Sequence, residues 1–198
     1  MKGDNPRGAT ADLPLGPCRA GENVPWTVSW TGEQEFDLQI SQDFPGLVDL
    51  AQVQRSGIGL PKFAALHVTR HRTAMAKLLC HVCGKPTEKS DRYLFPTDSG
   101  GFVTLPDESR RYASNVPPVH LACARRAQKQ CPHLRGAGAI PIPYPHEVAP
   151  LMPRTDVVEG MEKLAQSMGQ NLKIVYSCYR LHGKRFSERV ERLRERNL

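Results

Sequence analysis

Two short stretches decide the fold of this chain: LCHVCGKP (Leu79–Pro86) and, further on, HLAC (His120–Cys123). Together they form the pattern C-x2-C-x36-H-x2-C. Zinc in proteins takes four thiolate or imidazole ligands in a tetrahedron, and two short-spaced pairs supply them without straining the backbone. Gly84 follows the second cysteine and permits the left-handed conformation that closes such a turn. The pattern predicts one structural Zn²⁺ on Cys80, Cys83, His120 and Cys123.

The other cysteines and histidines leave alternatives open. The six cysteines are unevenly spaced in 198 residues without an export signal, so a disulfide scaffold is not expected. Cys131 and His133 could replace His120 in the site, or complete a second site with another histidine. The simpler interpretation makes Cys131 a small buried residue and His133 a residue at a helix C-terminus. The other histidines considered are His67, His71 and His81; His81 lies inside the turn and is not counted as a ligand.

The segment between the two ligand pairs supports a zinc-centred module. Arg92–Phe95 and Gly101–Leu105 are short β-like runs around a turn-rich stretch, which predicts a hairpin. Strong helix formers in Val119–Gln130 predict a helix whose first turn carries the second ligand pair. This order resembles the treble-clef type of zinc finger over Cys80–Gln130. The resemblance implies an α+β fold with the second pair at the helix N-terminus; the departure is His120, where cysteine is commoner.

A wider resemblance covers Pro61–Leu134. Its elements are RHRTAM (Arg70–Met75), the Leu79–Pro86 stretch and PPVHLACARRAQKQCPHL (Pro117–Leu134). They are similar to a family of uncharacterised actinobacterial and phage-associated proteins. The resemblance implies a cytoplasmic zinc-binding protein and a larger role for Cys131 and His133, and it brings no known activity.

Charge is distributed unevenly along the chain. Its 27 Lys and Arg residues and 20 Asp and Glu residues give a net charge of +7, yet residues 1–60 are net acidic. The basic excess therefore follows Leu60, where nucleic acid or another anionic partner is a fair hypothesis beside a plainly solvated surface. A basic helix is expected over Lys62–Leu79, and a second basic stretch lies on the zinc-braced helix. The candidate nucleic-acid contacts are Arg70, Arg72, Arg125, Arg126 and Lys129.

The expected organisation is α+β: a small zinc-stabilised treble-clef-like core with added N-terminal strands and a C-terminal helix-strand-helix. Residues 1–23 are expected to be a flexible tail, 24–60 an acidic β-rich segment, 61–135 the zinc-binding basic domain, 136–154 a proline-rich linker and 155–198 a C-terminal α/β segment with a basic terminal helix. The individual elements are strands at Pro25–Trp30, Glu35–Ile40 and Leu172–Leu181, and helices at Phe44–Arg55, Asp156–Met168 and Ser187–Leu198.

The sequence lacks the motifs of several classes of enzyme. No histidine between Cys83 and His120 could act as the base of an HNH nuclease, and neither the zinc-deaminase pattern nor a P-loop is present. No window approaches the ~18 apolar residues of a membrane span, so we expect a cytoplasmic protein without a membrane partner. The first hypothesis is a non-catalytic nucleic-acid-binding protein that contacts DNA. The second is a protein–protein adaptor or a subunit of a phage-related or host-defence assembly, and an unrecognised enzyme comes third.

Overall fold

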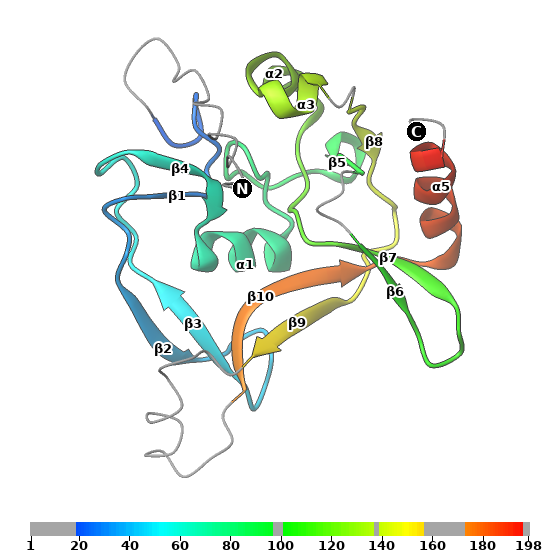
Figure 1. The fold of residues 1–198 in the computed structure, drawn as a ribbon, viewed down its shortest axis with the longest axis horizontal. Coiled ribbons are helices and arrows are strands. Elements are labelled where there is room, and N and C mark those ends of the chain that lie inside the picture. The colour runs from blue at the N-terminus through cyan, green and yellow to red at the C-terminus, as the bar shows by residue number, and fades with distance from the viewer. Residues whose placement is uncertain (1–18, 97–100, 137–138, 157–172, 196–198) are drawn as a thin grey trace, which may run out of the picture.

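A computed structural model describes residues 19–96, 101–136, 139–156 and 173–195. The described elements mix helices and strands, which confirms the α+β class. Figure 1 shows the larger strands below, α2 and α3 together at the top and α5 along one side. The predicted helix Asp156–Met168 and most of the predicted tail lie outside the described residues. Residues 19–23, also assigned to the tail, form a turn in which the Val24 amide donates to the Arg19 carbonyl.

Within the described residues, six strands form the main sheet. The order is β2-β3-β10-β7-β6, and β9 pairs with β10. β10 is the organising strand because it pairs in parallel with β3 and antiparallel with β7 and β9. The predicted strand at Leu172–Leu181 is thus confirmed, and Cys178 on it is fully buried. The strands are β2 (Phe36–Ile40), β3 (Val48–Gln52), β6 (Gly101–Thr104), β7 (Arg110–Ser114), β9 (Leu151–Asp156) and β10 (Ile174–Leu181).

Two smaller sheets flank the main one. β1 (Val28–Trp30) pairs with β4 (Pro61–Leu66), and β5 (Tyr93–Leu94) pairs with β8 (Ile142–Pro143). The helix predicted over Lys62–Leu79 is therefore wrong in its first part, because β4 occupies these positions by pairing with β1. The helix α1 (Val68–Lys77) begins only after His67, whose Nδ1 accepts the Arg70 amide hydrogen at 3.2 Å. Strand pairing has overridden local helix propensity here.

The hairpin and the short helix predicted from sequence are also corrected. β5 does not pair with β6; it pairs with β8 and bridges to Val119, while β6 forms the hairpin with β7. Phe44–Arg55 is not a helix but a turn followed by β3, since Ser41 Oγ accepts the Phe44 amide hydrogen and β3 then pairs with β2.

The proline-rich stretch 136–154 is not a linker in its described part. It supplies β8, the buried Tyr144 and most of β9. Prolines are tolerated in strands that have a free edge, and Pro143 and Pro153 lie in β8 and β9. The proline content of the stretch is that of a linker, but its strands pair with partners far away in the sequence.

The helices pack on the sheets through small apolar clusters. α5 (Lys184–Glu195) buries Phe186 and Val190 against Tyr112 and Tyr144, and begins before the predicted Ser187. α1 lies on β3 and β10, where Met75 packs with Val175. The remaining helical segments are a 3₁₀ turn η1 (Lys89–Asp91), α2 (Leu121–Gln130) and the short α3 (Pro132–Gly136). No described helix combines the length and the apolar character needed to cross a lipid bilayer.

Candidate metal centre

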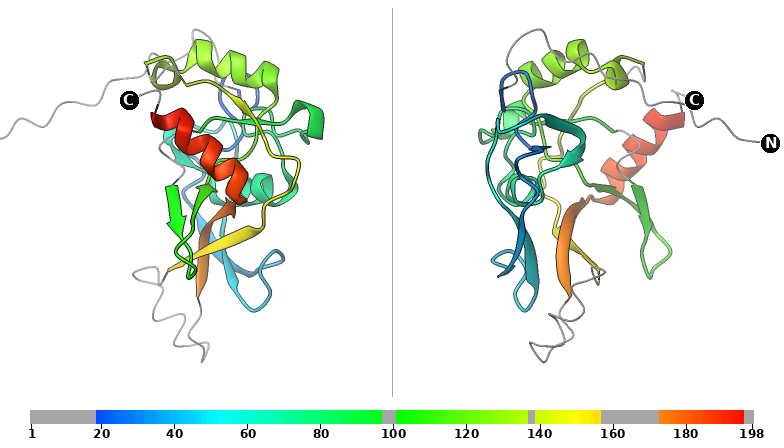
Figure 2. Two further views of the ribbon diagram at one scale, coloured as in Figure 1. Left: turned by 90° about the vertical axis from the view of Figure 1, so that its right-hand side faces the viewer. Right: turned by 60° about the vertical axis from the view of Figure 1, so that its left-hand side comes forward.

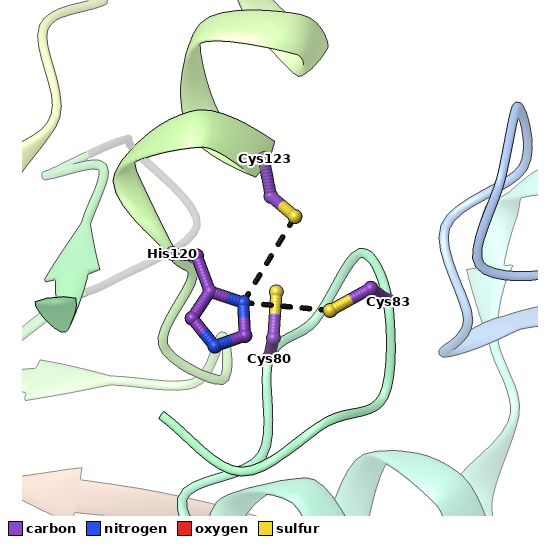
Figure 3. Close-up of side chains that lie close together, drawn as sticks. All are labelled: Cys80, Cys83, His120 and Cys123. Atoms are coloured by element: carbon purple, nitrogen blue, oxygen red, sulfur yellow. Dashed lines mark hydrogen bonds between the residues drawn. The ribbon is translucent and has the colours of Figure 1, made fainter. Parts of the chain in front are cut away.

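The four predicted ligands meet at one point. One ligand atom from each of Cys80, Cys83, His120 and Cys123 lies within 4.8 Å of the others (Figure 3). His120 Nδ1 is 3.4 Å from Cys83 Sγ and 3.9 Å from Cys123 Sγ. Bond lengths of ~2.3 Å to sulfur and ~2.1 Å to nitrogen give edges of about 3.6–3.8 Å in a tetrahedral zinc site. The residues present therefore fit a four-coordinate metal ion.

A tight turn brings the first pair of ligands together. The Cys80 amide donates to the Lys85 carbonyl at 2.7 Å, and the Gly84 amide donates to the Cys80 carbonyl at 2.8 Å. Gly84 has φ +74°, and a Cβ there would lie 2.7 Å from the Trp26 ring. Glycine is thus required at this position both by the left-handed backbone and by the close approach of the indole.

The second pair sits where α2 begins, as predicted. His120 is the N-cap residue, but its ring does not cap the helix. Its Nε2 instead lies 3.0 Å from the Pro86 carbonyl, which fixes the tautomer and turns Nδ1 toward the three sulfurs. Asp91 takes over the capping role, because its carboxylate accepts the Leu121 amide hydrogen at 2.8 Å.

Backbone hydrogen bonds hold the two halves of the site together. The His81 amide donates to the Pro118 carbonyl at 2.8 Å, and Tyr93 and Val119 exchange two hydrogen bonds. Val82, Val119 and Ala124 pack beside Cys80 in one buried cluster. The four candidate ligands are therefore part of a small buried core whose two halves are joined by backbone hydrogen bonds.

Burial shapes the electrostatics of the thiols. Burial raises the pKa of Cys80. Burial, together with the nearby Cys80 and Cys83, raises the pKa of Cys123 to about 12. The raised pKa values of Cys80 and Cys123 show that these two thiols resist ionisation unless a cation compensates, and a bound metal ion would supply that charge.

The alternative ligands do not join this group. Among the described residues the four-atom cluster does not include Cys131, whose amide caps α2 by donating to the Ala127 carbonyl, or His133, which is exposed on α3. His67 and His71 are buried, and each has Nε2 on a backbone carbonyl, of Val53 and Asn115 respectively. His81 Nδ1 lies 2.5 Å from Thr27 Oγ1. His67 and His71 are thus buried polar groups, and neither they nor His81 belong to the ligand cluster of the described residues.

Two of the five predicted nucleic-acid contacts are wrong. Arg70 is 1% exposed, and its guanidinium holds both oxygens of the equally buried Glu33, at 2.6 and 2.8 Å. Arg72 is 3% exposed and pairs with Asp49 at 3.1 Å. Both arginines are committed to buried carboxylates, and neither can reach a phosphate.

The three candidates on α2 differ from one another. Arg125 and Lys129 are exposed. Arg126 is half-buried and donates to the Gly21 carbonyl at 3.3 Å, so it connects the N-terminal turn to α2. The basic surface of α2 is therefore centred on Arg125 and Lys129.

Sequence reasoning missed the acceptors Glu33 and Asp49. No local pattern marks them, because each lies more than twenty residues from its arginine. The sequence carries one indirect signal: residues 1–60 have an excess of acidic residues, and the residues after them have an excess of basic ones. Two acidic residues of the first region form buried ion pairs with arginines of the second region.

No family model, curated protein or solved structure matches this chain.

Proposed function

We propose that this chain is a non-catalytic, zinc-stabilised nucleic-acid-binding protein that contacts DNA through its zinc module. Three thiolates and one imidazole are a common donor set of structural zinc sites. Four protein ligands leave no open coordination position, whereas catalytic zinc keeps one for water or substrate. The donor set therefore supports zinc in a structural role.

The order of elements around the site supports the likeness to treble-clef zinc fingers. The turn at Leu79–Pro86 is followed by the β6–β7 hairpin and then by α2, which carries the second ligand pair. One feature departs from a free-standing finger: β7 also pairs with β10, so the hairpin belongs to the main sheet. The proposed zinc module is thus built into a larger fold.

The observation that carries the DNA hypothesis is the exposed basic side of α2. Arg125 and Lys129 are exposed, and no ion pair among the described residues involves either of them. They are four positions apart and so share one face of the helix. A metal at the start of α2 would hold this face rigidly, which lowers the ordering cost of binding phosphate.

The test is binding of a fluorescein-labelled DNA duplex, followed by anisotropy over a series of salt concentrations. Removal of both charges in Arg125→Gln/Lys129→Gln should weaken binding and reduce the slope of log K against log salt by about 1.8, or about 0.9 for each phosphate that is no longer neutralised. Lys62→Gln/Lys77→Gln is the matched control, since it removes two exposed charges from β4 and α1. Absence of wild-type binding at low salt, or equal effects of the two variants, would overturn the proposal.

A protein–protein adaptor, including a subunit of a phage-related or host-defence assembly, is the second candidate. The observation in its favour is a run of exposed apolar side chains leading into and along β4: Ile58, Leu60, Phe63 and Leu66 are 59%, 64%, 43% and 39% exposed. Exposed apolar patches mark protein contacts. A partner captured by the chain that survives high salt and nuclease treatment would favour this function over DNA binding.

A further inference from the structure

The last helix, α5, carries a second basic surface far along the chain from the zinc module. Its buried side consists of Phe186, Ser187 and Val190, which fix the rotation of the helix against β7. Ser187 Oγ accepts the Tyr112 amide hydrogen at 2.8 Å and strengthens this attachment. The opposite side of α5 therefore faces solvent in a defined orientation.

Three exposed arginines line up on this solvent side of α5. Arg185, Arg189 and Arg192 are exposed and follow the spacing i, i+4, i+7, so they form one ridge along the helix. The acidic residues fall on a neighbouring stripe with the spacing i, i+3, i+7, namely Glu188, Glu191 and Glu195. Glu188 is three positions after Arg185 and four before Arg192, so it lies near both ends of the ridge, whereas Arg189 has no acidic residue three or four positions away on α5.

Other charged residues of α5 interact with residues outside the helix, and the three arginines of the ridge do not share in these contacts. Glu191 pairs with Arg110 at 2.9 Å, and the Arg194 guanidinium lies over the Phe102 ring at 5.6 Å. Among the described residues no ion pair includes a member of the ridge. Arg185 and Arg189 are four positions apart, where like charges destabilise a helix slightly, and an anionic partner would offset that cost.

We propose that the arginine ridge of α5 binds consecutive phosphates along one strand of duplex DNA, an inference that rests on the proposed DNA-binding function. Seven residues separate Arg185 from Arg192, a rise of about 10.5 Å. Phosphates of one strand advance ~3.4 Å along the axis of B-DNA, so the ridge covers about three such intervals, and each of its three side chains can reach a separate phosphate there. Arginine also offers the paired donors that fit a phosphate.

A duplex fits the ridge better than a single strand does. Single-strand binders stack bases on exposed aromatic side chains. The aromatic residues that are most exposed among the described ones, Phe36, Phe63 and Tyr176, lie on β2, β4 and β10 and not on α2 or α5. Figures 1 and 2 show that the C-terminal end of α5 points toward the end of the molecule that carries α2 and α3, but lies below the level of those two helices.

The test compares the salt dependence of duplex binding in the full chain and in Arg185→Gln/Arg189→Gln/Arg192→Gln. The slope of log K against log salt should fall by about 2.7 when three phosphates are no longer neutralised, and each single substitution should lower it by about 0.9. Arg19→Gln/Lys62→Gln/Lys77→Gln removes the same net charge from other surfaces and should change the slope far less. Metal content and thermal unfolding, measured for each variant, show that the fold is retained.

The outcomes separate this inference from the proposed function. Wild-type binding that weakens in the α2 variant but keeps its slope in the α5 variant overturns the ridge and leaves DNA binding intact. Equal slopes in the α5 variant and its charge-matched control also overturn it. Preference for single-stranded DNA of the same length contradicts the choice of a duplex, and the absence of any wild-type binding ends both proposals.

Discussion

At the scale of single residues, the interior is held by charges that a sequence pattern alone would place on the surface. Glu33 is fully buried and accepts hydrogen bonds from the Arg70 guanidinium and from the Trp30 and Arg55 amides. Its two carboxylate oxygens are therefore satisfied by one cation and two backbone donors. This carboxylate joins β1, the segment after β3 that contains Arg55, and α1.

Removal of the Glu33 carboxylate leaves the Arg70 charge buried without its counterion. Glu33→Ala should lower the free energy of unfolding by about 3–5 kcal/mol, the range found when one partner of a buried pair is deleted. Glu35→Ala is the control, since its pair with Arg55 is exposed and such pairs contribute about 0–1 kcal/mol. Urea denaturation measures both, and equal losses would contradict the central role of Glu33.

The same pair predicts a dependence on pH. Burial alone would raise the pKa of Glu33, but the hydrogen bonds from Arg70 and from the Arg55 amide outweigh it and hold the pKa below its ordinary value of 4.5. A lowered folded pKa stabilises the protein above the unfolded value and loses that contribution as the pH falls through the folded pKa. In urea denaturation over a pH series, the stability advantage over Glu33→Gln should thus be full near neutrality and shrink below about pH 4.5. An advantage that grows on acidification would contradict the assignment.

Substitution of two cysteines tests the ligand assignment: Cys123 in the first turn of α2 and Cys131 at its C-terminal end. Cys123→Ser should abolish stoichiometric zinc, because serine does not replace a thiolate at such a site. Cys131→Ser should retain it, because Cys131 lies outside the four-atom cluster of the described residues. Metal content per chain, measured after gel filtration, decides the matter. Zinc loss in the Cys131 variant would reopen the alternative ligand set.

At the scale of elements, β10 orders its neighbours through one side chain as well as through its backbone. The Arg180 guanidinium donates to the carbonyls of Met75 and Ala76 in the last turn of α1, and to that of Ala149. The last carbonyls of a helix have no partner inside it, and a cation is favoured at a helix C-terminus. One arginine therefore joins α1 to the central strand and to the segment that leads into β9.

Arg180→Leu should lower the free energy of unfolding by about 3 kcal/mol or more, since hydrogen bonds to a charged group contribute ~1.5–3 kcal/mol each. Arg154→Leu is the matched control, because Arg154 is exposed on β9 and its guanidinium lies over the Tyr179 ring at 5.4 Å. The loss in the control should stay near ~0.5–1 kcal/mol. Thermal unfolding of both variants provides the comparison, and a stable Arg180 variant would refute this role.

At the scale of the whole molecule, hydrogen bonds connect segments that lie far apart in the sequence. The Trp26 amide donates to the Val82 carbonyl, so the chain before β1 lies along the ligand turn. Arg126 of α2 reaches the Gly21 carbonyl from the other side. The acidic N-terminal region is thereby attached both to the candidate metal centre and, through Glu33 and Asp49, to α1.

The sequence by itself determined the features that depend on near neighbours along the chain. The ligand pairs, the glycine at the turn and the helix after His120 follow from spacing and local propensity, and the structure brings these ligands together as predicted. β1, β2 and β10 lie within stretches that the sequence predicts as strands. Only the tertiary structure decided which strands pair, that the proline-rich stretch is part of the sheets, and that Arg70 and Arg72 are buried. Those outcomes depend on partners far away in the sequence, and the free energy of burying a charge or pairing a strand is set by these partners, not by the residue's own surroundings in sequence.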